Sequence, residues 1–333
     1  MPFRFLVAAL FVASLASQIG SAQQITSDMV ISGASLNDGY GGVLCGNEGQ
    51  IYRFSGYGRP APVMRVSRDG STTMFYLPDE GAPEVIAPAG TGLNILASRL
   101  VSHKEGRMFE MDHFDNQANL LMQHRLSIDF VPTKMAIMSS GKTVVLGFHP
   151  GNSSLEDHKY GGAVLDAGDQ VIKRFELPLP PGGGGWTFGS GMSAGDDAAY
   201  VMLYSNEGPK TAIAAISAEG HLDVKLVRLL PDAEDRHHNE WLFGPGVAVE
   251  EYRYFGYVGG TKRAFLGFDE YDLRTGKKVA TKSTVPVGFA GGCYLGNEFS
   301  MLAHSAHVDP ARGLSPDTLR VVTTKLTDGR TTR

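Results

Sequence analysis

Short apolar runs, each interrupted by a tight polar turn, recur along most of the chain. The recurring element is an apolar strand, a turn containing Gly or Asn beside an acidic residue, and a second strand. This pattern predicts β-hairpins. The clearest examples are "MRVSRDGSTTMFYLP" (64–78), "FEMDHFDNQANLLMQHRL" (109–126), "AVLDAGDQVIKRFELP" (163–178), "AAISAEGHLDVKLVRLLP" (214–231), "FDEYDLRTGKKVATKSTVP" (268–286) and "VVTTKLTDGRTT" (321–332).

The turns of these hairpins are evenly spaced. They fall at Gly70, Asn116, Asp169, Gly220, Gly276 and Gly329, between 46 and 56 residues apart. Another hairpin precedes each of them, and its copies in the first and last repeats read almost alike, "GGVLCGNEGQIYRF" (41–54) and "GGCYLGNEFSMLA" (291–303). The chain therefore consists of six repeats, each with two hairpins and four strands.

Six repeats of this size favour a ring of small sheets. One four-stranded sheet cannot bury both faces alone, whereas packing it between two neighbours buries both, and closing the ring removes the open ends. A β-solenoid would have shorter repeats, and two packed sandwiches would not give one period. We therefore predict an all-β fold, a six-bladed β-propeller of four-stranded antiparallel blades in one domain, residues 23–333. The predicted blades are 36–78, 84–127, 132–178, 188–231, 243–286 and 288–333.

The last repeat is too short for a complete fourth strand. The segment "ITSDMVIS" (25–32) precedes the first repeat and has no partner there. We expect it to pair into the last blade, because an unpaired edge strand would otherwise face water. In blade pattern, such as "LDAGDQV" and "ISAEGHL", the chain resembles the superfamily of six-bladed propellers of the NHL-like and TolB-like kind. This resemblance implies the fold and no particular chemistry.

Composition agrees with a strand-and-turn protein and excludes some partners. The chain is 42% hydrophobic and only 20% charged, with 42 Gly and 17 Pro among 333 residues. The formal net charge is −5, and Lys and Arg do not cluster in the sequence. We therefore expect no nucleic-acid partner.

The N-terminus predicts export. Residues 1–22 contain Arg4, the apolar run "FLVAALFVASLA" and the small residues "GSA" before Gln23. This order is typical of a cleavable signal peptide, and the apolar run is short for a membrane span. An uncleaved N-terminal anchor is the alternative. We expect a secreted or periplasmic monomer that has no membrane-inserted segment after cleavage.

The two cysteines are predicted to meet where the ring closes. Cys45 and Cys293 occupy matching innermost strands of the first and last repeats, which are neighbours in a closed ring. An oxidising compartment favours a disulfide between them. The alternative is a pair of buried, unpaired thiols.

Histidine is concentrated in the segments that join strand 4 to strand 1 and strand 2 to strand 3. In propellers these segments gather on one face, around the mouth of the channel, and loops on a rigid scaffold often carry binding sites. Both tryptophans and several carboxylates fall there too. The candidate ligand-binding residues are His149, His158, Trp186, His237, His238, Glu240, Trp241, His304 and His307.

Two functions are compatible with these residues. We favour an exported, non-catalytic propeller that binds a protein partner or a small polar ligand on this face. The alternative is a metal-assisted hydrolase or lyase, because imidazole and carboxylate groups bind divalent ions and transfer protons. The candidate metal ligands are His237, His304 and His307, although no pair has a strong metal-binding spacing. Solvated surface histidines remain a third interpretation, and the sequence identifies no catalytic residue.

Overall fold

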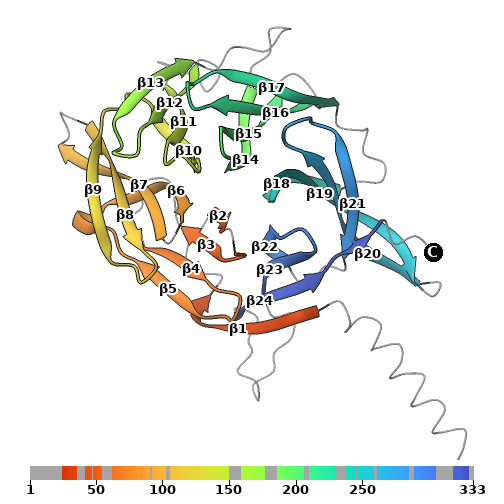
Figure 1. Cartoon of the computed structure of the whole chain (residues 1–333). Helices are drawn as coiled ribbons and strands as arrows, with labels where there is room; N and C mark the ends of the chain where they lie inside the picture. The colour runs from red at the N-terminus through yellow and green to blue at the C-terminus, as the bar shows by residue number, and fades with distance from the viewer. Residues whose placement is uncertain are drawn as a thin grey trace, which may run out of the picture.

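A computed structural model describes most of the chain. The described residues are 25–35, 42–46, 48–54, 62–90, 92–102, 106–149, 159–176, 186–205, 210–229, 237–244, 246–258, 261–284, 289–304 and 318–329. Their strands form six separate antiparallel sheets arranged in a ring (Figure 1). The protein is a six-bladed β-propeller, as the repeats predict. The predicted signal peptide lies outside the described residues.

Each blade is built from consecutive strands. Blade 1 contains β2 (Gly42–Cys45), β3 (Ile51–Phe54), β4 (Val63–Val66) and β5 (Thr72–Phe75). Blade 2 contains β6 (Ala82–Ala89), β7 (Gly92–Ser102), β8 (Gly106–Asp115) and β9 (Leu120–Leu126), after the short 3-10 turn η1 (Pro78–Glu80). Blade 3 contains β10 (Val131–Ile137), β11 (Thr143–His149), β12 (Lys159–Leu165) and β13 (Val171–Glu176).

The second half of the ring repeats this arrangement. Blade 4 contains β14 (Trp186–Ala194), β15 (Ala198–Ser205), β16 (Lys210–Ser217) and β17 (Leu222–Leu229). Blade 5 contains β18 (His237–Gly244), β19 (Val247–Val258), β20 (Thr261–Asp272) and β21 (Lys278–Thr284). Blade 6 contains β22 (Phe289–Tyr294), β23 (Glu298–His304) and β24 (Thr318–Lys325), and its fourth strand is β1 (Ile25–Ser35).

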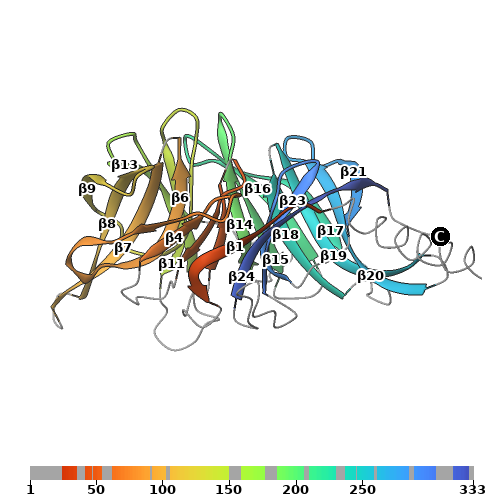
Figure 2. The ribbon, with the colours of Figure 1, turned by 90° about the horizontal axis from the view of Figure 1, so that it is seen from below.

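Strand order gives the propeller two different faces. The first strand of every blade lies next to the central axis, and successive strands follow outward with alternating direction (Figure 1). Consequently the first strands begin, and the second strands end, on one face, which we call the loop face. The tight turns between strands 1 and 2 and between strands 3 and 4 lie on the opposite face, the turn face, where they rise together in Figure 2.

Apolar side chains fill the spaces between the blades. Each of the six boundaries between neighbouring blades holds a cluster of buried hydrophobic residues. At the boundary of blades 2 and 3, for example, Met111 and Leu96 pack with Val145 and Leu165. Because both faces of each small sheet are covered in this way, the sheets are stable only as a ring.

The N-terminal strand closes the ring, as predicted. β1 runs antiparallel to β24, with Ile25 opposite Thr324 and Val30 opposite Arg320 (Figure 1). Ile31 is buried in the cluster between blades 6 and 1, and Asp28 forms an ion pair with Arg320 at 2.7 Å.

The predicted disulfide joins the same two blades near the axis. Cys45 ends β2 of blade 1, Cys293 lies in β22 of blade 6, and their Cα atoms are 5.3 Å apart. Within the described part of the chain no helix has the length and hydrophobicity to span a membrane.

The C-terminal segment differs from the expectation. Residues 321–332 were expected to form one more hairpin, but after β24 the short strand β25 (Thr327–Asp328) crosses to blade 5 and pairs with β21. The physical reason is that β1 already occupies the outer edge of β24, so the chain finds its next free edge on the neighbouring blade.

Candidate functional site

The structure places the backbone of most predicted ligand-binding residues but the side chain of only one. Trp186, His237, His238, Glu240, Trp241 and His304 lie on strands whose backbone is described, and His158 and His307 lie outside the described residues. Trp186 begins β14, His237 begins β18 and His304 ends β23, so three blades carry these residues to the loop face. The predicted ligand site and the predicted metal ligands at the channel mouth stay predictions.

His149 is the predicted residue whose side chain is described. It ends β11 on the loop face, and its ring lies against Phe130 with a centroid distance of 5.9 Å. Phe130 belongs to the hydrophobic cluster between blades 2 and 3, together with Phe109. His149 therefore lies on the loop face at the boundary between blades 2 and 3.

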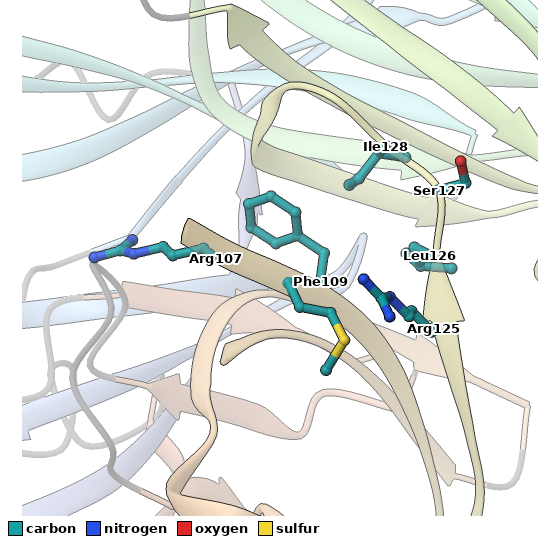
Figure 3. A pocket seen from close by; sticks show the side chains of 7 residues that line it. Arg107, Phe109, Arg125, Leu126, Ser127 and Ile128 are labelled. Carbon is teal, nitrogen blue, oxygen red and sulfur yellow. The ribbon is translucent and has the colours of Figure 1, made fainter. Parts of the chain in front are cut away.

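A cavity of about 380 Å³ lies at the loop-face end of the β8–β9 hairpin of blade 2. Its walls come from the beginning of β8 and from the end of β9 with the residues that follow it, and Figure 3 shows their side chains. The lining residues are Arg107, Met108, Phe109, Arg125, Leu126, Ser127 and Ile128. The cavity thus combines an apolar wall with two guanidinium groups.

The two arginines differ in their partners. Arg107 is half exposed, and its guanidinium lies 3.4 Å from a carboxylate oxygen of Glu84. Arg125 is exposed and forms no hydrogen bond or ion pair within the described residues. Glu110 lies opposite Arg125 in the sheet, but its carboxylate is paired with the buried Arg99. The guanidinium of Arg125 therefore presents its five donors to solvent at the edge of the cavity.

The local sequence explains how the cavity forms. Arg107 and Arg125 stand at the two open ends of the β8–β9 hairpin, where Phe109 is opposite Leu126. Antiparallel pairing therefore brings two arginines that are distant in sequence to the same end of one sheet. Sequence analysis did not identify them, because the pairing register that brings them to one end of the sheet cannot be read from "RMFEMDHFDNQANLLMQHRL" alone.

A second polar group lies at the other end of the same hairpin, towards the turn face. His113 Nε2 and His124 Nδ1 lie 2.6 Å and 2.7 Å from the same atom, Oδ2 of Asp169. The histidines belong to β8 and β9 of blade 2, and Asp169 comes from the β12–β13 turn of blade 3. On the far side of His113, Nδ1 lies 3.0 Å from Oδ1 of Asn94. This contact joins neighbouring blades through one buried carboxylate.

Sequence analysis placed no site here, but two signals existed. His113 and His124 flank one hairpin turn and fall on the same face of the sheet, since Met111 is opposite His124 and Met122 is opposite His113. Asp169 occupies a turn position at which Gly70 and Gly220 stand in blades 1 and 4. Aspartate tolerates this backbone conformation and, unlike glycine, carries a carboxylate that can reach a neighbouring blade.

Comparisons with known proteins find similar solved structures at very low sequence identity. No protein-family model and no curated protein matches the chain. Among solved structures, an N11 neuraminidase-like protein of A/flat-faced bat/Peru/033/2010 is similar with a TM-score of 0.49 and 7% identity over 89% of each chain. The polysaccharide lyase Uly1 is similar with a TM-score of 0.46 and 9% identity, covering 89% of this chain and 92% of the lyase. The Neurospora crassa Pan2 WD40 domain is similar with a TM-score of 0.45 and 10% identity, covering 88% of this chain and 91% of that domain.

Proposed function

We propose that the protein is an exported, non-catalytic propeller that binds a small anionic ligand with an apolar body in the cavity at the loop-face end of the β8–β9 hairpin. The observation that carries this proposal is the guanidinium of Arg125, which has no partner within the described residues and lines the same cavity as Phe109 and Ile128, from the other face of the sheet. Figure 3 shows these side chains at the end of the hairpin.

The size and chemistry of the cavity support a small organic acid. Ligand cavities in proteins typically measure about 300–1,000 Å³ and combine apolar walls with a few polar groups. The volume of about 380 Å³ falls at the lower end of this range. A guanidinium binds a carboxylate or phosphate in a bidentate manner, and the rings and methyl groups of the wall would cover the apolar remainder of the ligand.

The disulfide supports export. Disulfides persist in oxidising compartments and are rare in the cytosol, so the Cys45–Cys293 bond favours a secreted or periplasmic protein. Together with the strand β1 it holds the blades in a fixed ring, and a rigid scaffold suits a binding site on the loop face.

Replacement of Arg125 should weaken the binding of aromatic anions. With phenyl phosphate and benzoate as probes, we expect Arg125→Gln to lower affinity about 10-fold to 100-fold, because a hydrogen bond to a charged group contributes about 1.5–3 kcal/mol. Isothermal titration calorimetry measures the change. Arg263→Gln is the matched control, since Arg263 is an exposed arginine near the beginning of the third strand of blade 5. Benzyl alcohol, which lacks the anion, should bind weakly to every variant.

The same titrations separate this site from the channel mouth. If the aromatic anions bind equally well to wild type and Arg125→Gln but lose affinity when His237 and His304 are both replaced by Gln, the ligand site lies on the predicted histidine-rich surface and the cavity proposal is wrong. If no probe binds and native mass spectrometry finds a protein partner on the loop face, the proposal of a small anionic ligand is also wrong.

A further inference from the structure

We propose that His113, His124 and Asp169 form a zinc site that fastens blade 2 to blade 3. One ligand atom from each residue lies within 4.8 Å of the other two, and this is the one such group of three found among the described residues. Two imidazoles and a carboxylate are a ligand set that Zn²⁺ accepts, with a fourth position left for water or another donor.

The contact with Asn94 orients the His113 ring. With Oδ1 of Asn94 accepting the hydrogen on Nδ1, Nε2 is the ring atom that faces Asp169, at 2.6 Å. Without a metal this short contact is a hydrogen bond, and a bound cation would replace the proton that the two groups share. An amide oxygen that orients the outer nitrogen of a histidine is also the usual arrangement behind a metal ligand.

The backbone at Asp169 supports a role for its carboxylate. Its φ of 62° lies in the left-handed region, which costs a non-glycine residue roughly 1–2 kcal/mol. The corresponding turn positions of blades 1 and 4 hold Gly70 and Gly220. The side chain of Asp169 is 3% exposed, so the fold both strains the backbone and buries a negative charge to direct this carboxylate at two imidazoles.

The site can open to the metal with small movements. Zinc bonds of roughly 2.1 Å at tetrahedral angles place the ligand atoms roughly 3.4 Å apart. The present separations of 2.6 Å and 2.7 Å must therefore widen by less than about 1 Å. His124 lies on the outermost strand with its side chain 32% exposed, and Asp169 lies on a hairpin turn. Both positions allow such a shift, and the exposed edge of His124 gives the ion a route of entry.

The position of the site in the fold explains how a bound metal would stabilise the ring. The outer strands of a blade lie farther from the axis than the inner ones, so neighbouring blades are farther apart there (Figure 1). His113 and His124 come from the third and fourth strands of blade 2, and a metal at Asp169 would join two hairpins at this outer radius. The disulfide plays the corresponding role at the inner radius between blades 1 and 6.

Titration of the full chain with Zn²⁺ alone tests the site. We expect one equivalent to bind in calorimetry and the melting temperature to rise by about 5 °C when free Zn²⁺ is about 100 times its dissociation constant. Asp169→Asn keeps the side-chain shape and tolerates the left-handed backbone, and His124→Gln removes one imidazole. Each variant should raise the dissociation constant for Zn²⁺ by about 10-fold or more. Loss of even an outer hydrogen-bond partner of a metal ligand usually lowers metal affinity by about 10-fold to 100-fold.

The controls distinguish this site from other histidines and from misfolding. His221→Gln removes an exposed histidine in the β16–β17 turn and should leave Zn²⁺ binding unchanged. Asp169→Gly relieves the backbone strain, so it should fold well and still lose the metal. The inference is overturned if wild type binds no Zn²⁺, or if Asp169→Gly and His124→Gln bind it as tightly as wild type does.

Discussion

Reduction of the Cys45–Cys293 disulfide is expected to lower the free energy of unfolding by about 5 kcal/mol. The two cysteines are 248 residues apart, so the bond closes a loop that contains nearly the whole propeller. In the chain-entropy model a loop of this length restricts the unfolded ensemble strongly, and reduction releases that restriction. Urea denaturation with and without a thiol reductant measures the difference.

A double alanine variant separates the covalent bond from the packing of the two sulfur atoms. Cys293 is fully buried among the apolar residues between blades 6 and 1, so Cys45→Ala with Cys293→Ala also loses contacts there. This variant should be about as unstable as the reduced wild type, or slightly less stable, and should not respond to reductant. A wild type whose urea midpoint is the same in both conditions contradicts the expected role of the bond.

The fold could be predicted because its signals are local and repeated. Each hairpin is encoded by an apolar run, a turn and a second run. The even spacing of turns such as Gly70 and Gly220 shows that the hairpins repeat, and the number of repeats predicts the number of blades. Ring closure followed from counting strands, which left residues 25–32 without a partner. The position of β25 was not predictable in this way. A two-residue strand pairs with whichever sheet edge is free nearby, and that depends on the complete ring.

The candidate sites were less predictable because they depend on register. Arg107 and Arg125 reach the same end of the sheet because Phe109 pairs with Leu126, and the same register turns Arg125, which is opposite Glu110, to the face away from Phe109. The contact of Asp169 with His113 depends further on how blade 3 is placed against blade 2. The enrichment of histidine in the loops pointed to the channel mouth instead. Composition gives the type of each residue but not the distance between side chains.

Replacement of Arg99 by Met is expected to lower the free energy of unfolding by about 3–5 kcal/mol at neutral pH. Arg99 lies on β7 with its side chain 8% exposed, and its guanidinium contacts carboxylates of Asp112 at 2.9 Å and of Glu110. It also donates to the carbonyl oxygen of Pro78. Without it, the fully buried Asp112 keeps the hydrogen bond from the side-chain amide of Gln123, at 2.8 Å, and loses the cation that faces it.

Dependence on pH identifies the cause of this loss. Burial already raises the pKa of Asp112 above its usual value, and removal of the guanidinium raises it further, because a nearby positive charge favours the ionised form. A carboxyl with a raised pKa in the folded state contributes stability below the pKa of the unfolded chain, near 4, and loses it as pH rises through the folded pKa. The deficit of Arg99→Met should therefore be smallest near pH 4 and grow towards pH 8 in urea denaturation.

Arg107→Met is the matched control, since it removes a half-exposed arginine from the neighbouring strand whose contact with Glu84 is 3.4 Å long. It should cost less than about 1 kcal/mol, because a solvated guanidinium at this distance contributes little. Adding Asp112→Asn to Arg99→Met should recover part of the loss at pH 7, since the amide keeps the shape of the side chain without its charge. The opposite outcome is a loss of stability in Arg99→Met that is the same at pH 4 and pH 8 and that Asp112→Asn does not reduce. It would show that the blade is destabilised by lost packing of the arginine side chain and not by an unpaired buried carboxylate.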